Sequence, residues 1–215
     1  MAIDHWTTTP TLRGERVLLR PTVLADVDGL ARAYDVETTR YFLYGSQSGP
    51  PTEESVAEAL GLSSGPSFAS PSSRLAEPLA SGRQVLTQIE IGTGEIVGTT
   101  SIYNMSEVHR RVTVGYTWLT SRVRGSAINS ESKLLLFDHC FERLGAVRVE
   151  LNVDEKNERS RRAVQAIGAT EEGALRRHAR RADGSWRTTM VYSVIDQEWP
   201  QVRARLVERI NRRTR

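Results

Sequence analysis

Residues 112–127 read VTVGYTWLTSRVRGSA, and this stretch decides the fold. Its first half, residues 112–119, alternates β-branched and aromatic residues with others, which is typical of a strand. Its second half contains arginines, a glycine and small side chains, and apolar residues recur at helical spacing over 128–144. A strand that turns directly into a helix leaves free backbone N–H groups at the helix start, and these attract phosphate. The sequence therefore predicts a phosphate-binding turn over 122–127.

The rest of the chain predicts an α/β (α+β) fold. Further strands are expected over 16–20, 85–91, 96–103, 147–153 and 188–195, the last in a hairpin with the turn Asp183-Gly184. Further helices are expected over 25–37, 52–60, 158–167 and 198–210. Asn157 and Gly168 are the natural caps of the helix over 158–167. Early antiparallel strands followed by a strand–helix–strand–helix section indicate a mixed, mostly antiparallel sheet with helices on both faces.

The 215 residues suit a single domain over 1–215, in which two segments differ from the rest by composition. Residues 61–82 are rich in Gly, Ser and Pro and lack periodicity. We expect a flexible loop there, either a disordered connection or a lid on the substrate side. Residues 198–215 are expected to form a basic C-terminal helix and tail.

Composition excludes several classes of protein. Cys140 is the only cysteine, so no internal disulfide forms, and no apolar run reaches membrane-spanning length. The first residues lack a basic region followed by an apolar segment, so we expect no signal peptide. We therefore expect a cytoplasmic protein without a membrane partner. The four histidines lack the spacing of metal ligands, so no metal is expected. The net charge of +3 and the pI of about 9.3, with arginine dominating over lysine, favour anionic partners, for which coenzyme A suffices.

Two linked motifs resemble a known superfamily. The spacing Arg-x-x-Gly-x-Ala at Arg122, Gly125 and Ala127 resembles the pyrophosphate-binding signature of the GNAT superfamily of N-acetyltransferases. The block NERSRRAV at 157–164, followed by Ile-Gly-Ala at 167–169, resembles a second segment of that superfamily. With a serine in it, this block is similar to the RimJ/RimL-like branch, which acetylates the N-terminal amines of ribosomal proteins. The resemblance extends from about residue 12 to residue 199.

The resemblance implies a GNAT fold and acetyl-CoA as co-substrate. The strands over 112–119 and 147–153 are then parallel neighbours that splay apart to admit the cofactor. The pantetheine arm pairs with the first of these strands, at Tyr116, Thr117, Trp118 and Leu119. The pyrophosphate binds at the turn, which is formed by Arg122, Arg124, Gly125, Ser126 and Ala127. Asn157 and Arg162 hold the cofactor from the other side.

The catalytic residues are less clearly marked. The superfamily commonly uses a tyrosine to protonate the leaving thiolate, but the corresponding region here reads Ala163-Val164, so Ser160 is the better candidate. Members of the branch often carry a glutamate as base where this chain has Thr113. Glu150 and Glu90 are substitutes by type and expected location.

Three functions stay open. The leading hypothesis is an N-acetyltransferase in which a primary amine, on a protein N-terminus or a small molecule, attacks acetyl-CoA directly in a ternary complex. The second is a non-catalytic acyl-CoA-binding protein, because the usual base and acid are replaced. The third is a ribosome- or RNA-associated protein, suggested by the arginine clusters, but no RNA-binding motif is present, so a nucleic-acid partner ranks last. The resemblance also makes a homodimer an option.

Overall fold

The computed structural model describes residues 5–35, 50–55, 83–181 and 183–213. The loop predicted over 61–82 therefore lies outside the described residues, as do residues 56–60 of the helix predicted over 52–60. The start of that helix is described, and the Thr52 hydroxyl accepts a hydrogen bond from the Ser55 N–H (3.2 Å), as expected of an N-cap.

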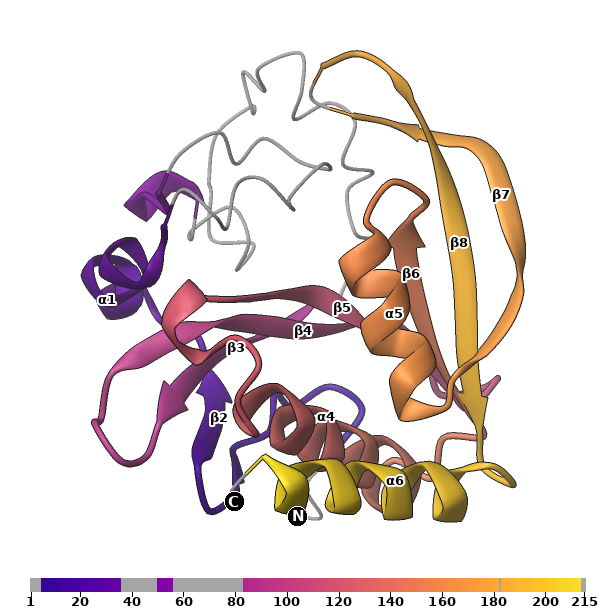
Figure 1. Cartoon of the computed structure of the whole chain (residues 1–215), viewed down its shortest axis with the longest axis horizontal. Helices are drawn as coiled ribbons and strands as arrows, with labels where there is room; N and C mark the ends of the chain where they lie inside the picture. The colour runs from indigo at the N-terminus through magenta and orange to yellow at the C-terminus, as the bar shows by residue number, and fades with distance from the viewer. Residues whose placement is uncertain (1–4, 36–49, 56–82, 182, 214–215) are drawn as a thin grey trace.

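Eight strands form one mixed sheet, which spreads across the molecule in Figure 1. In spatial order they run β1-β2-β3-β4-β5-β6-β8-β7, and only the β5–β6 pair is parallel within the described residues. The strands are β1 (Leu12–Arg13), β2 (Val17–Pro21), β3 (Gln84–Glu90), β4 (Ile96–Ser106), β5 (Arg111–Leu119), β6 (Arg148–Asp154), β7 (Thr170–Arg180) and β8 (Trp186–Ile195). This order confirms the mixed, mostly antiparallel sheet predicted from the sequence.

Helices cover both faces of the sheet. They are α1 (Val27–Ala33), α4 (Ile128–Asp138), α5 (Glu158–Ile167) and α6 (Trp199–Arg212). Figure 1 shows α4 and α6 packed side by side below the sheet. Leu119 belongs to the large core that they cover, whereas its neighbour Trp118 packs with Leu30 and Ala33 of α1 on the other face. Among the described residues, no helix combines the length and apolar character needed to cross a membrane.

Two helices differ in extent from the sequence prediction. The helix expected over 25–37 starts as a 3-10 turn at Leu24–Asp26 and ends at Ala33, because Tyr34 adopts an extended backbone (ψ 131°). The helix expected over 128–144 is α-helical to Asp138 and continues as a π-helical turn, His139–Arg143. Periodicity alone does not distinguish a π turn from an α turn.

The parallel pair separates soon after it begins. Its paired residues are Arg111 with Arg148, Val112 with Val149, and Thr113 with Glu150, and no later pair forms within the described strands. Beyond these pairs, β5 and β6 run in diverging directions (Figure 1). Backbone groups of β5 beyond Thr113 on this side thus lack a neighbouring strand, which leaves them available to a ligand.

A bulge in β5 accompanies this separation. Tyr116 has φ +50°, and β4 pairs Thr99 with Trp118 but Ser101 with Gly115, so β5 contains one residue more than β4 over this interval. The extra residue changes which face later side chains occupy. The simple alternation predicted over 112–119 is therefore wrong in detail. Thr113 is buried between two buried valines because elements cover both sides of the strand.

Candidate active site

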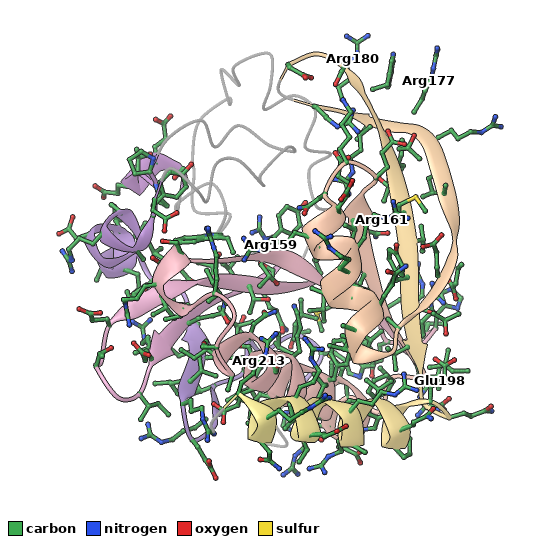
Figure 2. The ribbon with its side chains drawn as sticks, in the orientation of Figure 1. Arg159, Arg161, Arg177, Arg180, Glu198 and Arg213 are labelled. Atoms are coloured by element: carbon green, nitrogen blue, oxygen red, sulfur yellow. The ribbon has the colours of Figure 1, made fainter. Side chains whose placement is uncertain are left out.

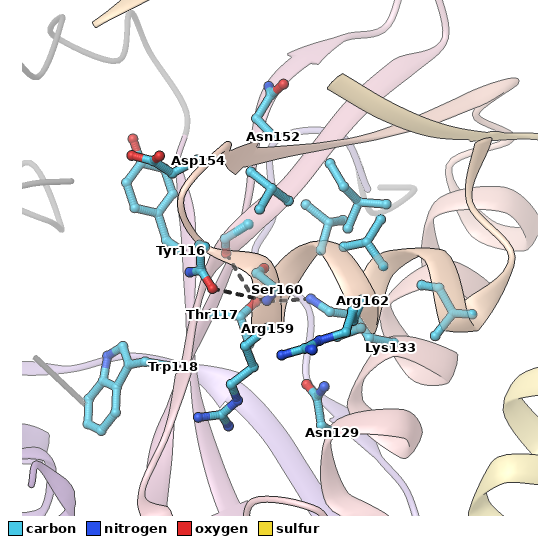
Figure 3. Close-up of a pocket in the computed structure, with 18 of the residues that line it drawn as sticks. Tyr116, Thr117, Trp118, Asn129, Lys133, Asn152, Asp154, Arg159, Ser160 and Arg162 are labelled. Atoms are coloured by element: carbon cyan, nitrogen blue, oxygen red, sulfur yellow. Dashed lines mark hydrogen bonds between the residues drawn. The ribbon is translucent and has the colours of Figure 1, made fainter. Parts of the chain in front are cut away.

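A cavity of about 1040 Å³ lies where β5 and β6 separate. Its walls come from β4, β5, the start of α4, β6, α5, the β7–β8 hairpin and the end of α6. Figure 3 shows Thr117, Lys133 and Ser160 gathered at its centre, with Arg159 and Arg162 beside them. The gap between the diverging strands is thus the interior of a site lined by polar and cationic side chains.

The turn before α4 has the geometry of an anion site. Gly125 adopts φ +80°, a left-handed conformation, and a Cβ added there would meet no atom within 4 Å. Within the described residues, the backbone N–H groups of Gly125 and Ala127 donate no hydrogen bond. Gly125 also lines the cavity. Unused N–H groups at the positive end of a helix bind phosphate well.

Asp35, just after α1, holds this turn in place. Its carboxylate accepts hydrogen bonds from the Ser121 N–H (2.6 Å) and the Thr120 hydroxyl (3.2 Å). It also pairs with Arg124 (3.4 Å), whose Nε donates to the Leu119 carbonyl (2.9 Å). Arg124 lines the cavity, so this arginine both braces the turn and presents charge to the cavity.

Arg122 and Glu90 occupy a different place from the one the sequence suggested. Nη1 of Arg122 binds Glu90 (2.7 Å) and its Nη2 binds Glu95 (2.9 Å). These ion pairs keep the Arg122 guanidinium beside the β3–β4 turn, and neither Arg122 nor Glu90 is among the described residues that line the cavity. Ser126 and Ala127 belong to the turn but are not among the described residues that line the cavity: the Ser126 hydroxyl donates to the Val123 carbonyl (2.7 Å), and Ala127 is buried.

The opposite wall comes from α5. Asn157 caps this helix, because its Oδ1 accepts the Ser160 N–H (3.0 Å), and Gly168 ends it with φ +97°. Both caps confirm the sequence prediction. Asn157, Ser160 and Arg162 line the cavity together. The Ser160 hydroxyl makes no hydrogen bond to a described residue, so it is available to a ligand.

Glu150 stands just outside the described lining of the cavity. Its carboxylate accepts hydrogen bonds from Arg148 (2.9 Å) and from Nδ2 of Asn152 (2.8 Å), and it is Asn152 that lines the cavity. Tyr103 of β4 also lines the cavity, and burial raises the pKa of its phenol well above the usual value. Tyr103 therefore stays a neutral hydrogen-bonding group at physiological pH.

The far end of the cavity contains a buried ion pair. Asp154 binds Arg181 through two hydrogen bonds of 2.7 and 2.8 Å, and both side chains are about 5% exposed or less. Burial raises the pKa of Asp154, but hydrogen bonds from Arg181 and the Lys156 N–H outweigh burial and hold the pKa below its usual value. Nearby on β7, Nδ1 of His178 forms a hydrogen bond with the Thr189 hydroxyl (2.9 Å).

This geometry can be set beside known proteins. Residues 16–170 match the acetyltransferase (GNAT) domain family. The chain belongs to this family. Its structure resembles that of a candidate acetyltransferase from T. thermophilus, with 35% identity over 95% of this chain and 99% of the other, and a TM-score of 0.76. These matches confirm the superfamily, the fold and the acyltransferase class predicted from the sequence.

Two further likenesses point to one branch of the GNAT family. A Bacillus subtilis (strain 168) protein named as a candidate ribosomal N-acetyltransferase, YdaF, is 31% identical over 53% of this chain, and the match spans 63% of that relative's length. Mycobacterium smegmatis RimJ, solved in complex with CoA-disulfide, is 26% identical, covers 93% of this chain and 94% of the other, and has a TM-score of 0.68.

Several cavity-lining cations of this acetyltransferase were not found from the sequence, among them Lys133, Arg209 and Arg213. Lys133 on α4 donates from Nζ to the Thr117 hydroxyl (2.9 Å). Arg209 in the last turn of α6 and Arg213 just after the helix reach the cavity, and Arg213 donates to the Ser126 carbonyl (2.9 Å) beside the start of α4 (Figure 2). In the sequence, these two arginines are indistinguishable from ordinary surface residues, because only tertiary packing brings them to the turn. One sequence feature could have identified Lys133 as a site residue: it is a cation on the helix that follows the turn predicted to bind phosphate.

Proposed function

We propose that this chain transfers the acetyl group of acetyl-CoA to a primary amine by direct attack in a ternary complex. The observation that carries the proposal is the continuity of one cavity. It connects the turn at Arg124 and Gly125, where the N–H of Gly125 donates no hydrogen bond to a described residue, to the interior of the gap between β5 and β6. A cofactor with a polyanionic head and a long neutral arm fits such a path, and M. smegmatis RimJ, a structural relative, was solved with a CoA compound.

The described residues suggest a role for each part of the cavity. In this proposal the pyrophosphate binds the N–H groups of the turn, with charge from Arg124, Arg162, Arg209 and Arg213. The pantetheine arm runs along the backbone of Tyr116–Leu119, which has no paired strand on the β6 side. Asn157 closes the site from the start of α5. Arg122 is left out, because its guanidinium is held by two carboxylates away from the cavity.

The chemistry requires a neutral amine, a stabilised carbonyl oxygen and a donor for the leaving sulfur. A backbone N–H of β5 near Thr117 donates a hydrogen bond to the oxygen, and the Ser160 hydroxyl donates a hydrogen bond to the sulfur. Glu150 is not among the described residues that line the cavity and would act only through Asn152. Glu90 is not among them either, and it is paired with Arg122. His178 lines the cavity and is the better proton acceptor, because Asp154 is engaged by Arg181.

The acceptor we favour is the N-terminal amine of a protein. The likenesses to YdaF and RimJ support this choice, as does chemistry: an α-amine, with a pKa of about 8, is partly neutral at physiological pH, whereas lysine is not. Small-molecule amines are the alternative acceptor. A homodimer is compatible with the proposal, and sedimentation velocity measures it.

Release of CoA thiol tests the function. Purified protein is mixed with acetyl-CoA and either pooled peptides with free N-termini, the same peptides blocked at the N-terminus, or a panel of small amines. We expect thiol release with the free peptides alone. Release with the small amines instead would move the acceptor to that class. Tight binding of acetyl-CoA without thiol release in any arm would favour the acyl-CoA-binding protein, a function suggested by Thr113 and Val164 at the usual positions of base and acid.

A further inference from the structure

Lys133 is a buried cation that faces the cavity with few partners. Its residue is 8% exposed, and its Nζ donates to the Thr117 hydroxyl (2.9 Å). Thr117 in turn shares a hydrogen bond with the Thr100 hydroxyl (2.8 Å). An ammonium has three donors, and within the described residues only this one is used. Two N–H groups of Lys133 therefore remain for whatever occupies the cavity.

The choice of residue is itself informative. The chain has 29 basic residues, of which only Lys133 and Lys156 are lysines. Lys156 is exposed on the turn between β6 and α5, whereas Lys133 is buried. A buried lysine can gain and lose a proton near neutral pH, but a guanidinium stays charged. Of the basic side chains among the described residues that line the cavity, only Lys133 and His178 can transfer a proton near neutral pH, because the others are arginines.

The position of Lys133 relates it to one part of the ligand. It contacts β5 at Thr117, between the turn that starts at Arg124 and the last residue paired with β6, Thr113. A cofactor whose phosphates bind the turn reaches this point with its arm. That arm is uncharged except at the thioester, where negative charge develops on oxygen and then on sulfur as acyl transfer proceeds. A buried cation complements the charge that appears during reaction better than it complements the neutral ground state.

We propose that Lys133 receives the sulfur of coenzyme A: its ammonium binds the leaving thiolate and gives it a proton. The proposal rests on the proposed acetyl transfer. The acceptor nitrogen forms a C–N bond to the carbonyl carbon, and the C–S bond breaks with its electron pair left on sulfur. Lys133 transfers a proton to sulfur, which yields the CoA thiol and a neutral lysine amine. The proton lost by the acceptor nitrogen passes to His178 or water, and solvent reprotonates Lys133 as the thiol leaves.

The surroundings of Lys133 suit this exchange. Burial lowers the pKa of Lys133 to about 8, close to that of a thiol. Cys140, on the same helical segment, stays a neutral thiol because burial raises its pKa to about 12. No carboxylate of a described residue forms an ion pair with Lys133. Among the described residues, the other charged groups and the histidine that line the cavity are Arg124 before α4, Asp154 on β6, Arg159 and Arg162 on α5, His178 and Arg180 on β7, Arg187 on β8, Arg209 on α6 and Arg213 just after it.

Paired ligands test this role without an acceptor amine. CoA and desulfo-CoA, which lacks the sulfur, are titrated calorimetrically into the wild-type chain, K133M and K156M from pH 6 to 9. The ultraviolet absorbance of the thiolate reports ionisation of bound CoA. Methionine matches the length of lysine and removes a buried charge, so K133M should fold, which thermal unfolding checks. K156M is the matched control, because its lysine is exposed.

In the wild-type chain, we expect the thiol of bound CoA to ionise more readily than that of free CoA, by about tenfold or more in its ionisation constant. K133M should abolish this shift and weaken CoA binding by about tenfold to a hundredfold at the pH where the thiolate forms. Desulfo-CoA binding and the K156M variant should change little. An unaltered thiol ionisation in K133M, or equal losses for CoA and desulfo-CoA, would overturn the proposal. Failure of the wild-type chain to bind either ligand would instead contradict the proposed function.

Discussion

The two ends of the cavity contain similar charges in opposite arrangements. At the far end, the guanidinium of Arg181 binds Asp154 through two hydrogen bonds, and Arg187 lies 4.0 Å from the same carboxylate. We call the opposite end the cofactor end, because we propose that acetyl-CoA binds there. At this end Lys133, Arg162 and Arg209 form no ion pair with a described carboxylate. The buried Nε of Arg209 has no hydrogen-bond partner there either.

This contrast suggests that the ion pair at the far end stabilises the fold, whereas the cations at the cofactor end bind the ligand. A buried cation with its own carboxylate stabilises the fold as long as the pair is intact. Cations gathered in one cavity without carboxylates repel one another, and a bound polyanion removes that repulsion. Substitutions at the far end should therefore change stability, and substitutions at the cofactor end should change affinity.

The largest expected effect is at the far end. Asp154→Ala leaves Arg181, which is 4% exposed, without its buried partner, so the free energy of unfolding should fall by about 3–5 kcal/mol. Urea denaturation measures it. The matched control is Glu155→Ala, which removes the exposed second partner of Arg181 and should cost about 1 kcal/mol or less. Equal losses in the free energy of unfolding for the two variants would contradict a stabilising role for the buried pair at the far end.

The same pair sets an acid limit on stability. The folded pKa of Asp154 lies below its unfolded value of about 3.9. Its contribution is therefore fully present above about pH 5 and is lost as the pH falls through the folded pKa. Asp154→Asn should flatten the acid side of the stability profile, which chemical denaturation at several pH values records. An unchanged profile would show that other carboxylates dominate acid unfolding.

At the cofactor end we expect losses of affinity rather than of stability. Arg162→Ala and Arg209→Ala should each weaken acetyl-CoA binding by about tenfold, the contribution of a charge-assisted hydrogen bond to phosphate. Calorimetric titration measures it. Arg203→Ala is the matched control, because Arg203 of α6 pairs with Asp138 of α4 and neither is among the described residues that line the cavity. If Arg203→Ala weakened acetyl-CoA binding as much as the two variants do, the affinity would depend only on the total charge of the protein.

Glycines with matching backbone geometry sharpen the contrast further. Gly125 and Gly184 have φ +80° and +81°, and a Cβ added to either meets no atom within 4 Å. Alanine should therefore cost about 1–2 kcal/mol of stability at both positions, because the left-handed conformation is unfavourable. Only Gly125→Ala should also weaken acetyl-CoA binding. If Gly184→Ala weakened it equally, the loss would come from general destabilisation.

The smallest effect is predicted at Arg122. Its ion pairs with Glu90 and Glu95 are exposed, so Arg122→Ala should change stability by about 1 kcal/mol or less and leave acetyl-CoA affinity within about twofold. Thermal unfolding and titration of the same sample give both values. A tenfold loss of affinity would show that these ion pairs open when the cofactor binds, and would return Arg122 to the phosphate site.

Features encoded by neighbouring residues were predictable from the sequence. Helix α5 has the predicted bounds because its cap, Asn157, and its stop, Gly168, act within one turn of the helix. The turn before α4 was likewise visible as a glycine between a strand and a helix, and Gly125 has the left-handed backbone of such a turn, whereas its binding of phosphate stays a prediction. The bulge was not, because Tyr116 is a residue type that seldom adopts positive φ. Nor were the pairing of Arg122 with Glu90 and the approach of Arg213, since both depend on residues distant in sequence.

The placement of Arg209 and Arg213 has a consequence for the order of events during synthesis. The strands and the turn that face the cofactor lie between residues 84 and 195, yet the last cations of the cavity belong to the final helix. A ribosome makes this helix after the strands, so the nascent chain holds an incomplete form of the proposed phosphate site until residue 213 has emerged and α6 has docked on α4. Full cofactor affinity should therefore develop only after the sheet itself has been synthesised.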